Sequence, residues 1–598
     1  MSAIGATASA ITVVGPAEIE RARGTGASVE EVLRGVPGLA IRRSGGIGGG
    51  TDISIRGADS DQTLVMIDGI PVNDSASAQG GFDFSVLSLA NVARVEVLRG
   101  PQSGLYGGDA IGGVINIITR QGSGPPRGFA EIEGGSFGTF GQRGGVSGSS
   151  GRLSYAIGLS NFYSSGFSRR SDDNEADSTR KQAISAHLGY QISDTLKLGA
   201  RFGYYGLEAE IDQLSTSRSD AGNTFDRQFL EGALSATLTS FGGALETRAV
   251  LFANQTTRDV RECRNLACSS RQTTEFAGER YGAEITSTVK VRDGLDRLTL
   301  GGRILNESGA QQNQLTGGAL NRPYDISETH RAIYAGYGFS PFERLSLSFA
   351  GRLDDFGSGD FEGTYRLSAA FSVPETGSKL RASFGTGIKA PTIFQRFDAT
   401  FGNAGLETER SRGFDIGLDQ SLLAGRAELS ITYFDNKIDN LIIFVGSTLT
   451  GTYENVDAAE TKGVEVAGEW RMTDWARFRA AYTYLDAIDA TTGARLRQRP
   501  EHEGKVTLAF QPVPAAYLAA TAVFQSDHFN LAFLPSNPGR DRQQVEGFVR
   551  FDLDASYDLS DEATVFVRAE NVTDEVYEVN RGFNTPRRSA YGGVRVRF

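Results

Sequence analysis

The chain has 598 residues, 39% of them hydrophobic, with a formal net charge of −12 and 75 glycines. The acidic balance argues against nucleic acid as a partner. No stretch of roughly 18 consecutive apolar residues occurs, which excludes a membrane-spanning helix. The mean hydropathy of −0.25 fits a soluble β protein and also a membrane barrel, because barrel strands alternate polar and apolar residues.

The first part of the chain, residues 11–52, predicts a strand, a short helix, a second strand and a glycine-rich turn. Ser28 followed by Glu31 is a capping-box pattern, and Gly35 and Pro37 end the helix. Residues 42–52 are nearly half glycine, which predicts a flexible turn at the tip of a small domain. A phosphate-cradling loop is not expected there, because no Lys-Ser/Thr pair and no helix follow.

Three short apolar runs come next, at 63–67, 92–98 and 114–118. Each is closed by Gly, Asp, Asn or Pro, which is typical of short strands between tight turns. Between the first two runs, residues 73–88 hold small polar residues around two phenylalanines and predict a second loop. We place the end of this small domain at the two prolines 125 and 126.

From residue 128 to residue 598, apolar and polar residues alternate in one segment after another. In 345–353, for example, Leu, Leu, Phe, Gly and Leu alternate with Ser, Ser, Ala and Arg. This period of two indicates strands with one apolar face. Arginine recurs on the polar face, which would be costly in the dry core of a soluble β-sandwich, so a membrane barrel with a wet lumen is favoured. At roughly 20 residues per strand and connection, this part predicts about 22 strands.

Four segments of the first domain resemble the plug-domain signatures of TonB-dependent outer-membrane transporters. They are IRG at 55–57, LVMIDGIPVN at 64–73, RVEVLRGP at 94–101 and YGGDAIGGVINIIT at 106–119. The terminal Phe598, after AENVTDEVY, resembles the assembly signal of outer-membrane barrels. The resemblance implies an all-β protein of the bacterial cell outer membrane, in which an antiparallel barrel (128–598) encloses an N-terminal α+β plug domain (1–127).

An outer-membrane protein needs a signal peptide, and the first residues, MSAIGATASAITVV, lack its basic region, apolar core and cleavage site. We therefore expect the sequence to be a mature or trimmed form with an added Met1. The family's TonB box, a β-prone segment upstream of the plug, is also not recognisable before Ile11.

In this family, plug arginines and barrel glutamates form a buried ionic cluster that holds the plug. The resemblance implies this role for Arg56 and Arg99 of the plug and for Glu409 and Glu465 of the barrel. The segment GLETERS around Glu409 is similar to the family motif LxPExS but has threonine in place of proline, which leaves Asp415 as an alternative. Four isolated, solvated charges are the competing interpretation.

The two plug loops are expected to reach the outer side of the barrel. The resemblance implies that they contact substrate there, although a purely solvated second loop is an alternative. The candidate contact residues are Ser44, Ile47, Asn73, Ser75, Gln79, Phe82 and Phe84.

Two acidic segments, 172–177 and 208–226, offer hard oxygen ligands of the kind that calcium prefers. Charge runs in loops are more often simply solvated. The sequences EIDQ and FDRQ in the second segment resemble the calcium-binding loops of the cobalamin-transporter branch of the family. This resemblance implies a structural calcium ion held by Glu210, Asp212 and Asp226.

The chain has two cysteines, Cys263 and Cys268, which lie close together in a polar stretch. One local disulfide in an oxidising compartment is the main prediction. A metal site with only two protein ligands is the alternative.

No catalytic apparatus is visible. The four histidines are scattered without a carboxylate or cysteine at ligand spacing, and no GxSxG, HExxH or Walker sequence occurs. We predict that the chain is not an enzyme. The segments at 384–397 and 453–470 look most like the cobalamin-transporter branch.

The resemblance implies import of a large, scarce metal complex, energised by the TonB-ExbB-ExbD complex of the inner membrane. Cobalamin or a related corrinoid is the leading substrate, and an iron-siderophore or other metal chelate is the alternative. A passive porin and a signalling receptor are alternatives of another class. We expect a monomer in contact with the lipid bilayer and lipopolysaccharide, and no nucleic-acid partner.

Overall fold

The computed structural model describes residues 9–21, 28–77, 80–171, 174–212, 222–265, 267–316, 318, 321–357, 359–446, 451–534 and 537–598. Within these residues, no helix is long and apolar enough to cross a membrane.

In the described part of the chain, 22 strands close into an antiparallel barrel. Each strand pairs with the next, and the last pairs with the first, with Val596 opposite Ala130. One pairing skips two strands, because β27 (His528–Leu534) and β28 (Asn537–Val545) form a separate hairpin between β26 and β29. The barrel strands are β8 (Arg127–Gly135), β9 (Thr139–Ser150), β10 (Leu153–Ser164), β11 (Thr179–Gln191), β12 (Leu196–Glu210), β13 (Thr224–Ser240), β14 (Leu245–Cys263), β15 (Arg271–Val291), β16 (Asp296–Leu315), β17 (Asn321–Phe342), β18 (Leu345–Asp355), β19 (Phe361–Val373), β20 (Ser378–Lys389), β21 (Glu409–Leu422), β22 (Ala427–Val445), β23 (Thr452–Arg471), β24 (Ala476–Asp489), β25 (His502–Val513), β26 (Ala516–Gln525), β29 (Phe548–Asp558), β30 (Ala563–Glu570) and β31 (Ser589–Arg597).

Side chains alternate between the two faces of the barrel wall. In β18, Phe349 and Leu353 are 49% and 44% exposed on the outside, whereas Ala350 and Arg352 are 4% and 5% exposed on the inside. The apolar face thus points to the lipid and the arginines point to the lumen. The predicted all-β barrel of about 22 strands is confirmed.

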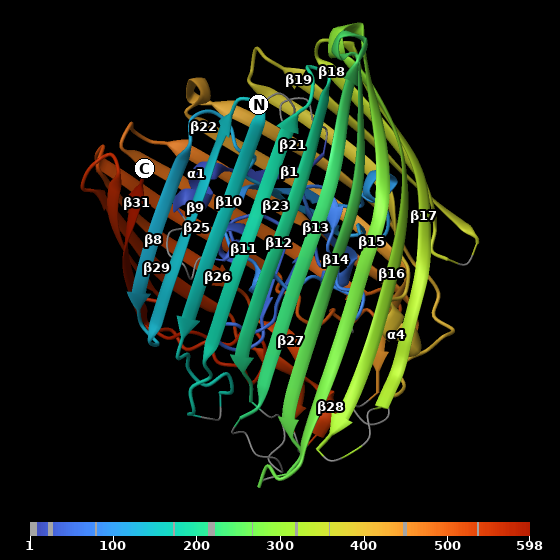
Figure 1. Ribbon diagram of the computed structural model, residues 1–598, viewed down its shortest axis with the longest axis vertical. Helices are drawn as coiled ribbons and strands as arrows, with labels where there is room; N and C mark the ends of the chain where they lie inside the picture. Colours follow the sequence, from blue (N-terminus) through green and yellow to red (C-terminus); the bar gives the residue numbers. More distant parts are fainter. Residues whose placement is uncertain are drawn as a thin grey trace.

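The two ends of the barrel differ in the length of their connections. At one end the strands are joined by tight turns, such as the one-turn helices η4 (Phe241–Gly243) and η5 (Arg292–Gly294). At the other end, the lower one in Figure 1, lie longer connections that carry α4 (Ile393–Phe397) and the β27–β28 hairpin. Membrane barrels have short periplasmic turns and longer external loops. We therefore name these ends the turn end and the loop end.

The described residues between 9 and 120 form a separate domain inside the barrel, the plug domain, which appears in blue behind the front strands in Figure 1. Its main sheet has the order β1-β6-β7-β4-β5, in which β4 and β7 are parallel, and β2 pairs with β3 in a hairpin. The three predicted apolar runs form β4, β6 and β7. The elements are β1 (Ile11–Val14), α1 (Pro16–Arg21), α2 (Val29–Leu33), β2 (Leu39–Arg43), β3 (Thr51–Ile55), η2 (Ser60–Gln62), β4 (Thr63–Ile67), β5 (Ile70–Pro71), η3 (Phe84–Val86), β6 (Val92–Arg99), α3 (Ser103–Tyr106) and β7 (Gly113–Thr119).

The predicted helix near residue 30 is present as α2, but the capping box is not. Ser28 stands at the N-cap without a side-chain cap hydrogen bond, and Glu31 pairs with Arg34 at 3.2 Å instead of reaching back to Ser28. Burial of Val29 and Leu33 in the plug core accounts for the helix without that cap.

Candidate functional site

The plug domain is held to the barrel wall by ion pairs, and the most buried of them centres on Glu465 of β23. The guanidinium of Arg56 donates to both oxygens of Glu465, Nε at 2.8 Å and Nη2 at 3.0 Å, and its Nη1 donates to Asp415 at 3.4 Å. Arg99 lies 3.5 Å from Glu465 and donates to the carbonyl of Pro37 at 2.9 Å. The structure therefore brings Arg56, Arg99 and Glu465 together, in the arrangement that the resemblance implied.

Glu409 does not join this group, which corrects the sequence prediction. Its carboxylate accepts hydrogen bonds from the Gln62 side chain at 3.1 Å and from the Ile442 backbone at 2.7 Å, and its nearest cation is Lys389 at 3.8 Å. Glu409 opens strand β21 at the loop end. Asp415, six residues further along the same face, lies roughly 20 Å nearer the turn end, at the level of Arg56. The strand register thus favours the aspartate alternative.

A second buried ionic group surrounds η2 of the plug. Lys389 of β20 lies 3.1 Å from Asp61 and Arg499 donates to Asp59 at 2.6 Å. Burial raises the pKa of Asp61 to about 7; Lys389 opposes that rise and Glu409 adds to it. Sequence reasoning missed these residues, although Lys389 continues the inward-facing positions of β20.

On the side of the barrel across from Glu465, the polarity of the contacts is the reverse of that around Glu465, because here the barrel supplies the cations and the plug supplies the carboxylates. Four consecutive strands, β12 to β15, each direct one arginine at a plug aspartate. The pairs are Arg201–Asp68 at 3.1 Å, Arg227–Asp83 at 2.7 Å, Arg258–Asp74 at 3.3 Å and Arg280–Asp109 at 4.0 Å. The only sequence signal for them was an arginine at an inward-facing position of each strand.

Four predicted substrate contacts, Asn73, Ser75, Phe82 and Phe84, are buried, which corrects the predicted exposure of these residues at an apex. Asn73 bonds Val65 N and Thr63 O within the plug, and Ser75 donates to Ser308 O of the wall at 2.6 Å. The rings of Phe82 and Phe84 pack in the plug core, 5.3 Å apart. Aromatic side chains are stabilised by such burial. Gln79 lies outside the described residues.

The glycine-rich turn at 44–50 does face the loop end, where loop residues clamp it. Arg169 donates to the Ser44 carbonyl at 2.9 Å, Asn580 donates to the Ser44 hydroxyl at 3.1 Å, and Thr179 donates to the Ile47 carbonyl. Gly48 has a φ of +93°, and a Cβ there would lie 2.4 Å from a Thr179 methyl, so only glycine permits this approach. Ser44 and Ile47, both half-buried, are the predicted contact residues that remain accessible.

A carboxylate cluster lies beside this clamp. Ligand oxygens of Glu175, Asp177 and Asp212 lie within 4.8 Å of one another, and the backbone N–H groups of Arg169 and Arg170 donate at 2.7 Å to Asp177 and Asp212. Burial raises the pKa of Asp177 to about 7, and the neighbouring Asp212 and Glu175 add to this rise against the Arg169 N–H.

Of the three predicted calcium ligands, only Asp212 lies in this cluster. Asp226 is held in the ladder of β13, opposite Glu208 and Asp259. The Glu210 carboxylate instead accepts a hydrogen bond from Ser178 N at 2.8 Å. The connection after β10 supplies the other two carboxylates, a long-range approach that the spacing of EIDQ and FDRQ did not indicate.

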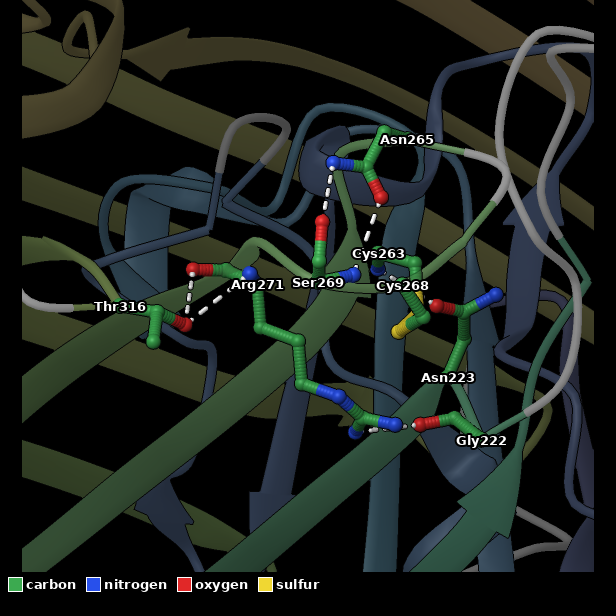
Figure 2. Close-up of a disulfide and its surroundings, with 8 residues drawn as sticks. All are labelled: Gly222, Asn223, Cys263, Asn265, Cys268, Ser269, Arg271 and Thr316. Carbon is green, nitrogen blue, oxygen red and sulfur yellow. Dashed lines mark hydrogen bonds between the residues drawn. A yellow bond between two sulfur atoms is a disulfide. The ribbon is translucent and has the colours of Figure 1, made fainter.

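Cys263 and Cys268 form a disulfide that closes the connection between β14 and β15 (Figure 2). Neighbouring loop residues brace it: Asn223 accepts from Cys263 N at 2.8 Å, and Arg271 donates to the Gly222 carbonyl at 2.8 Å. Within the loop, Asn265 and Ser269 are joined by two hydrogen bonds.

Replacing both cysteines by serine is expected to loosen this loop and leave the barrel intact. A disulfide across so short a loop contributes about 2 kcal/mol through chain entropy, and that contribution is local. Limited digestion with trypsin should therefore cleave C263S/C268S at Arg264 several-fold faster than the oxidised protein. Equal cleavage rates would show that the hydrogen bonds alone hold the loop.

Comparison with known proteins agrees with this architecture. The family model for "TonB dependent receptor-like, beta-barrel" matches residues 128–572, and that for "TonB-dependent Receptor Plug Domain" matches residues 4–114. The vitamin B12 transporter BtuB of Photobacterium profundum is 28% identical over 603 residues, covering 98% of this chain and 92% of that protein. BtuB of Vibrio cholerae is 25% identical over 611 residues, covering 96% and 90%.

Among solved structures, the siderophore receptor PirA from Acinetobacter baumannii superposes with a TM-score of 0.82 at 17% identity, covering 99% of this chain and 98% of that one. At this identity the likeness speaks for the fold alone. The family models, by contrast, match most of the chain, barrel and plug alike. The chain therefore belongs to the TonB-dependent receptor family of bacterial outer-membrane β-barrel proteins.

Proposed function

We propose that this protein imports cobalamin or a related corrinoid across the outer membrane, with energy delivered by the TonB-ExbB-ExbD complex. The observation that carries the proposal is the separately folded plug domain, ion-paired around its circumference to the barrel wall. A barrel of this size has a lumen too wide for selectivity by itself. A folded stopper makes passage depend on a step that moves it, which a passive porin does not need.

The choice of substrate class is supported by the similarity to vitamin B12 transporters, which runs along nearly the whole chain. The contact surface offered to the substrate is the clamped turn at 44–50, together with the loops around it. Asn580, Arg169 and Thr179 already fix this turn. A fixed turn can present backbone groups to a ligand with little loss of entropy on binding.

We further propose that Glu175, Asp177 and Asp212 hold a structural calcium ion. Three carboxylates in one small volume suit a hard divalent cation. The fit is supported by Oδ1 of Asp177, which is buried and has no hydrogen-bond partner among the described residues. A cation there would relieve the mutual repulsion of the carboxylates and order the connection that carries Arg169, and thereby the clamp on Ser44.

Calorimetry with cyanocobalamin, with and without calcium, tests both proposals. We expect corrinoid binding to tighten when calcium is present, and Asp212→Asn to weaken this calcium effect about tenfold, since ligand charge sets the affinity of such sites. Asp226→Asn is the matched control, because Asp226 lies outside the cluster and should leave the effect unchanged. No heat with cyanocobalamin in either condition would point to an iron chelate as the substrate.

A further inference from the structure

A cavity of about 80 Å³ separates the plug domain from one side of the barrel wall. Its plug side includes Asp74, Ser75 and Gly80 together with Tyr106, Gly108 and Asp109; its wall side is formed by β15 to β18, and its loop-end side by α4 and the residues before it. The charged and aromatic groups that line it include Tyr106, Asp109, Arg280, Glu307, His330 and Arg352.

The charges on the wall of this cavity are already paired with one another. Arg280 forms an ion pair with Glu307 at 2.9 Å, Arg352 donates to Asp354 at 2.9 Å, and Arg396 pairs with Glu328. Such a wall offers many hydrogen-bond donors and acceptors but carries little net charge. It can therefore contact a bulky polar solute of low net charge without trapping it, as a passage requires.

The contacts from β15 and β18 to residues 105–109 of the plug are longer than the hydrogen bonds between Arg56 and Glu465. The Asp109–Arg280 distance of 4.0 Å is the longest plug-to-barrel ion pair in the described part of the chain, and Arg352 reaches the Leu105 carbonyl at 3.4 Å. On the other side, Arg56 makes two hydrogen bonds to Glu465 at 2.8 and 3.0 Å. When Asp109 withdraws, Arg280 still keeps Glu307 as its partner, so no buried charge is left alone.

The plug segment beside the cavity also has a strained backbone. Asp109 has a φ of +69°, in the left-handed region that side chains other than glycine rarely adopt, and Gly107 has a φ of +93°. Such a conformation persists only while the surroundings enforce it. A segment of this kind can be displaced without dismantling the β-sheet of the plug.

We propose that the substrate crosses the plug domain on this side, between residues 105–109 of the plug and the inner wall of β15 to β18. This cavity is the transit site for a bulky polar solute of low net charge, and α4 with its preceding residues covers the outer mouth. The assignment rests on the proposed import function. The ion pairs around Glu465 stay closed while the substrate passes.

An engineered disulfide can seal the outer mouth. A Cβ placed on Gly80 lies 3.9 Å from the Cβ of Thr392, within the range of about 3.5–4.5 Å that disulfides adopt. Gly80→Cys with Thr392→Cys therefore ties the plug to the segment that leads into α4. The matched control, Asn91→Cys with Gly158→Cys, ties the plug to β10, away from the cavity and from the turn at 44–50. Its Cβ separation of 2.8 Å requires a shift of roughly 1 Å.

Both pairs are made in the C263S/C268S background, and uptake of radiolabelled cyanocobalamin by cells with an intact TonB system is measured before and after reduction. We expect the oxidised Gly80–Thr392 variant to bind cyanocobalamin normally but to lose at least tenfold in uptake, with recovery on reduction. The oxidised Asn91–Gly158 control should keep uptake within twofold of its reduced form.

Loss of uptake in both oxidised variants would show that the plug moves as one body and would overturn the proposal, as would full uptake in both. As a second variant, Ala332→Phe fills the cavity from the wall and should lower uptake, whereas Ala519→Phe, inward-facing on β26, should not. Absence of uptake by the reduced proteins and by the unaltered chain would instead refute the proposed import function.

Discussion

Replacing Glu465 by glutamine is expected to destabilise the seating of the plug domain by about 3–5 kcal/mol, because Arg56 and Arg99 then lie buried without their shared counter-charge. Both oxygens of Glu465 accept from Arg56, so the neutral amide loses one acceptor as well as the charge. Asp415 and the ring of Phe434, 4.7 Å from the guanidinium, remain as partners of Arg56 and set the lower end of this range.

The measured quantity is the urea concentration at which the plug opens the lumen. Ion conductance of single barrels in planar bilayers reports this opening. Conductance of the E465Q variant should appear at a clearly lower urea concentration, while the barrel itself resists unfolding as before. Glu469→Gln is the control on the same strand, because its pair with Arg479 is largely solvated and contributes under about 1 kcal/mol. Equal shifts in the two variants would refute a special role for Glu465.

Replacing Lys389 by methionine is expected to lower the stability of the plug-to-barrel contact by a similar amount at neutral pH. This loss of stability should become smaller as the pH is lowered. Without Lys389, Asp61 and Glu409 are two buried carboxylates with no cation between them. Protonation removes that repulsion. The difference in plug stability between the variant and the unaltered protein should therefore be small at pH 5 and largest at pH 8.

The unaltered protein should already show the same sign of pH dependence. Burial raises the pKa of Asp61 to about 7, so the folded state binds this proton more tightly than the unfolded state does. Stability of the plug should therefore fall as pH rises from about 4 to about 7 through this group. Asp61→Asn should remove that contribution and rescue part of the loss in Lys389→Met.

The pH dependence is measured by the same conductance assay at pH 5 and pH 8. Lys437→Met serves as the control, because its pair with Glu460 is half-exposed and should respond little to pH. A loss in Lys389→Met that is equal at both pH values would mean that the two carboxylates are not coupled through this lysine.

The sequence by itself determined the barrel, its approximate strand number and the presence of a folded domain before it. These properties depend on short stretches of sequence. The alternation of apolar and polar residues in a segment such as 345–353 sets which face contacts lipid, whatever its partner strand is. The plug strands are likewise bounded by turn residues within the same short segments. Arg56, Arg99 and Glu465 were reached through motifs that are themselves short.

Only the tertiary structure decided which charges meet. Arg56 and Glu465 are 409 residues apart, and the choice between Glu409 and Asp415 depends on the register of β21 against the plug. Asp177 meets Asp212 because two connections converge, and Phe82 turns inward because the plug core has room for it. Ion pairs form at a few ångströms and are set by how strands and loops are staggered in space, which no local pattern of residues encodes.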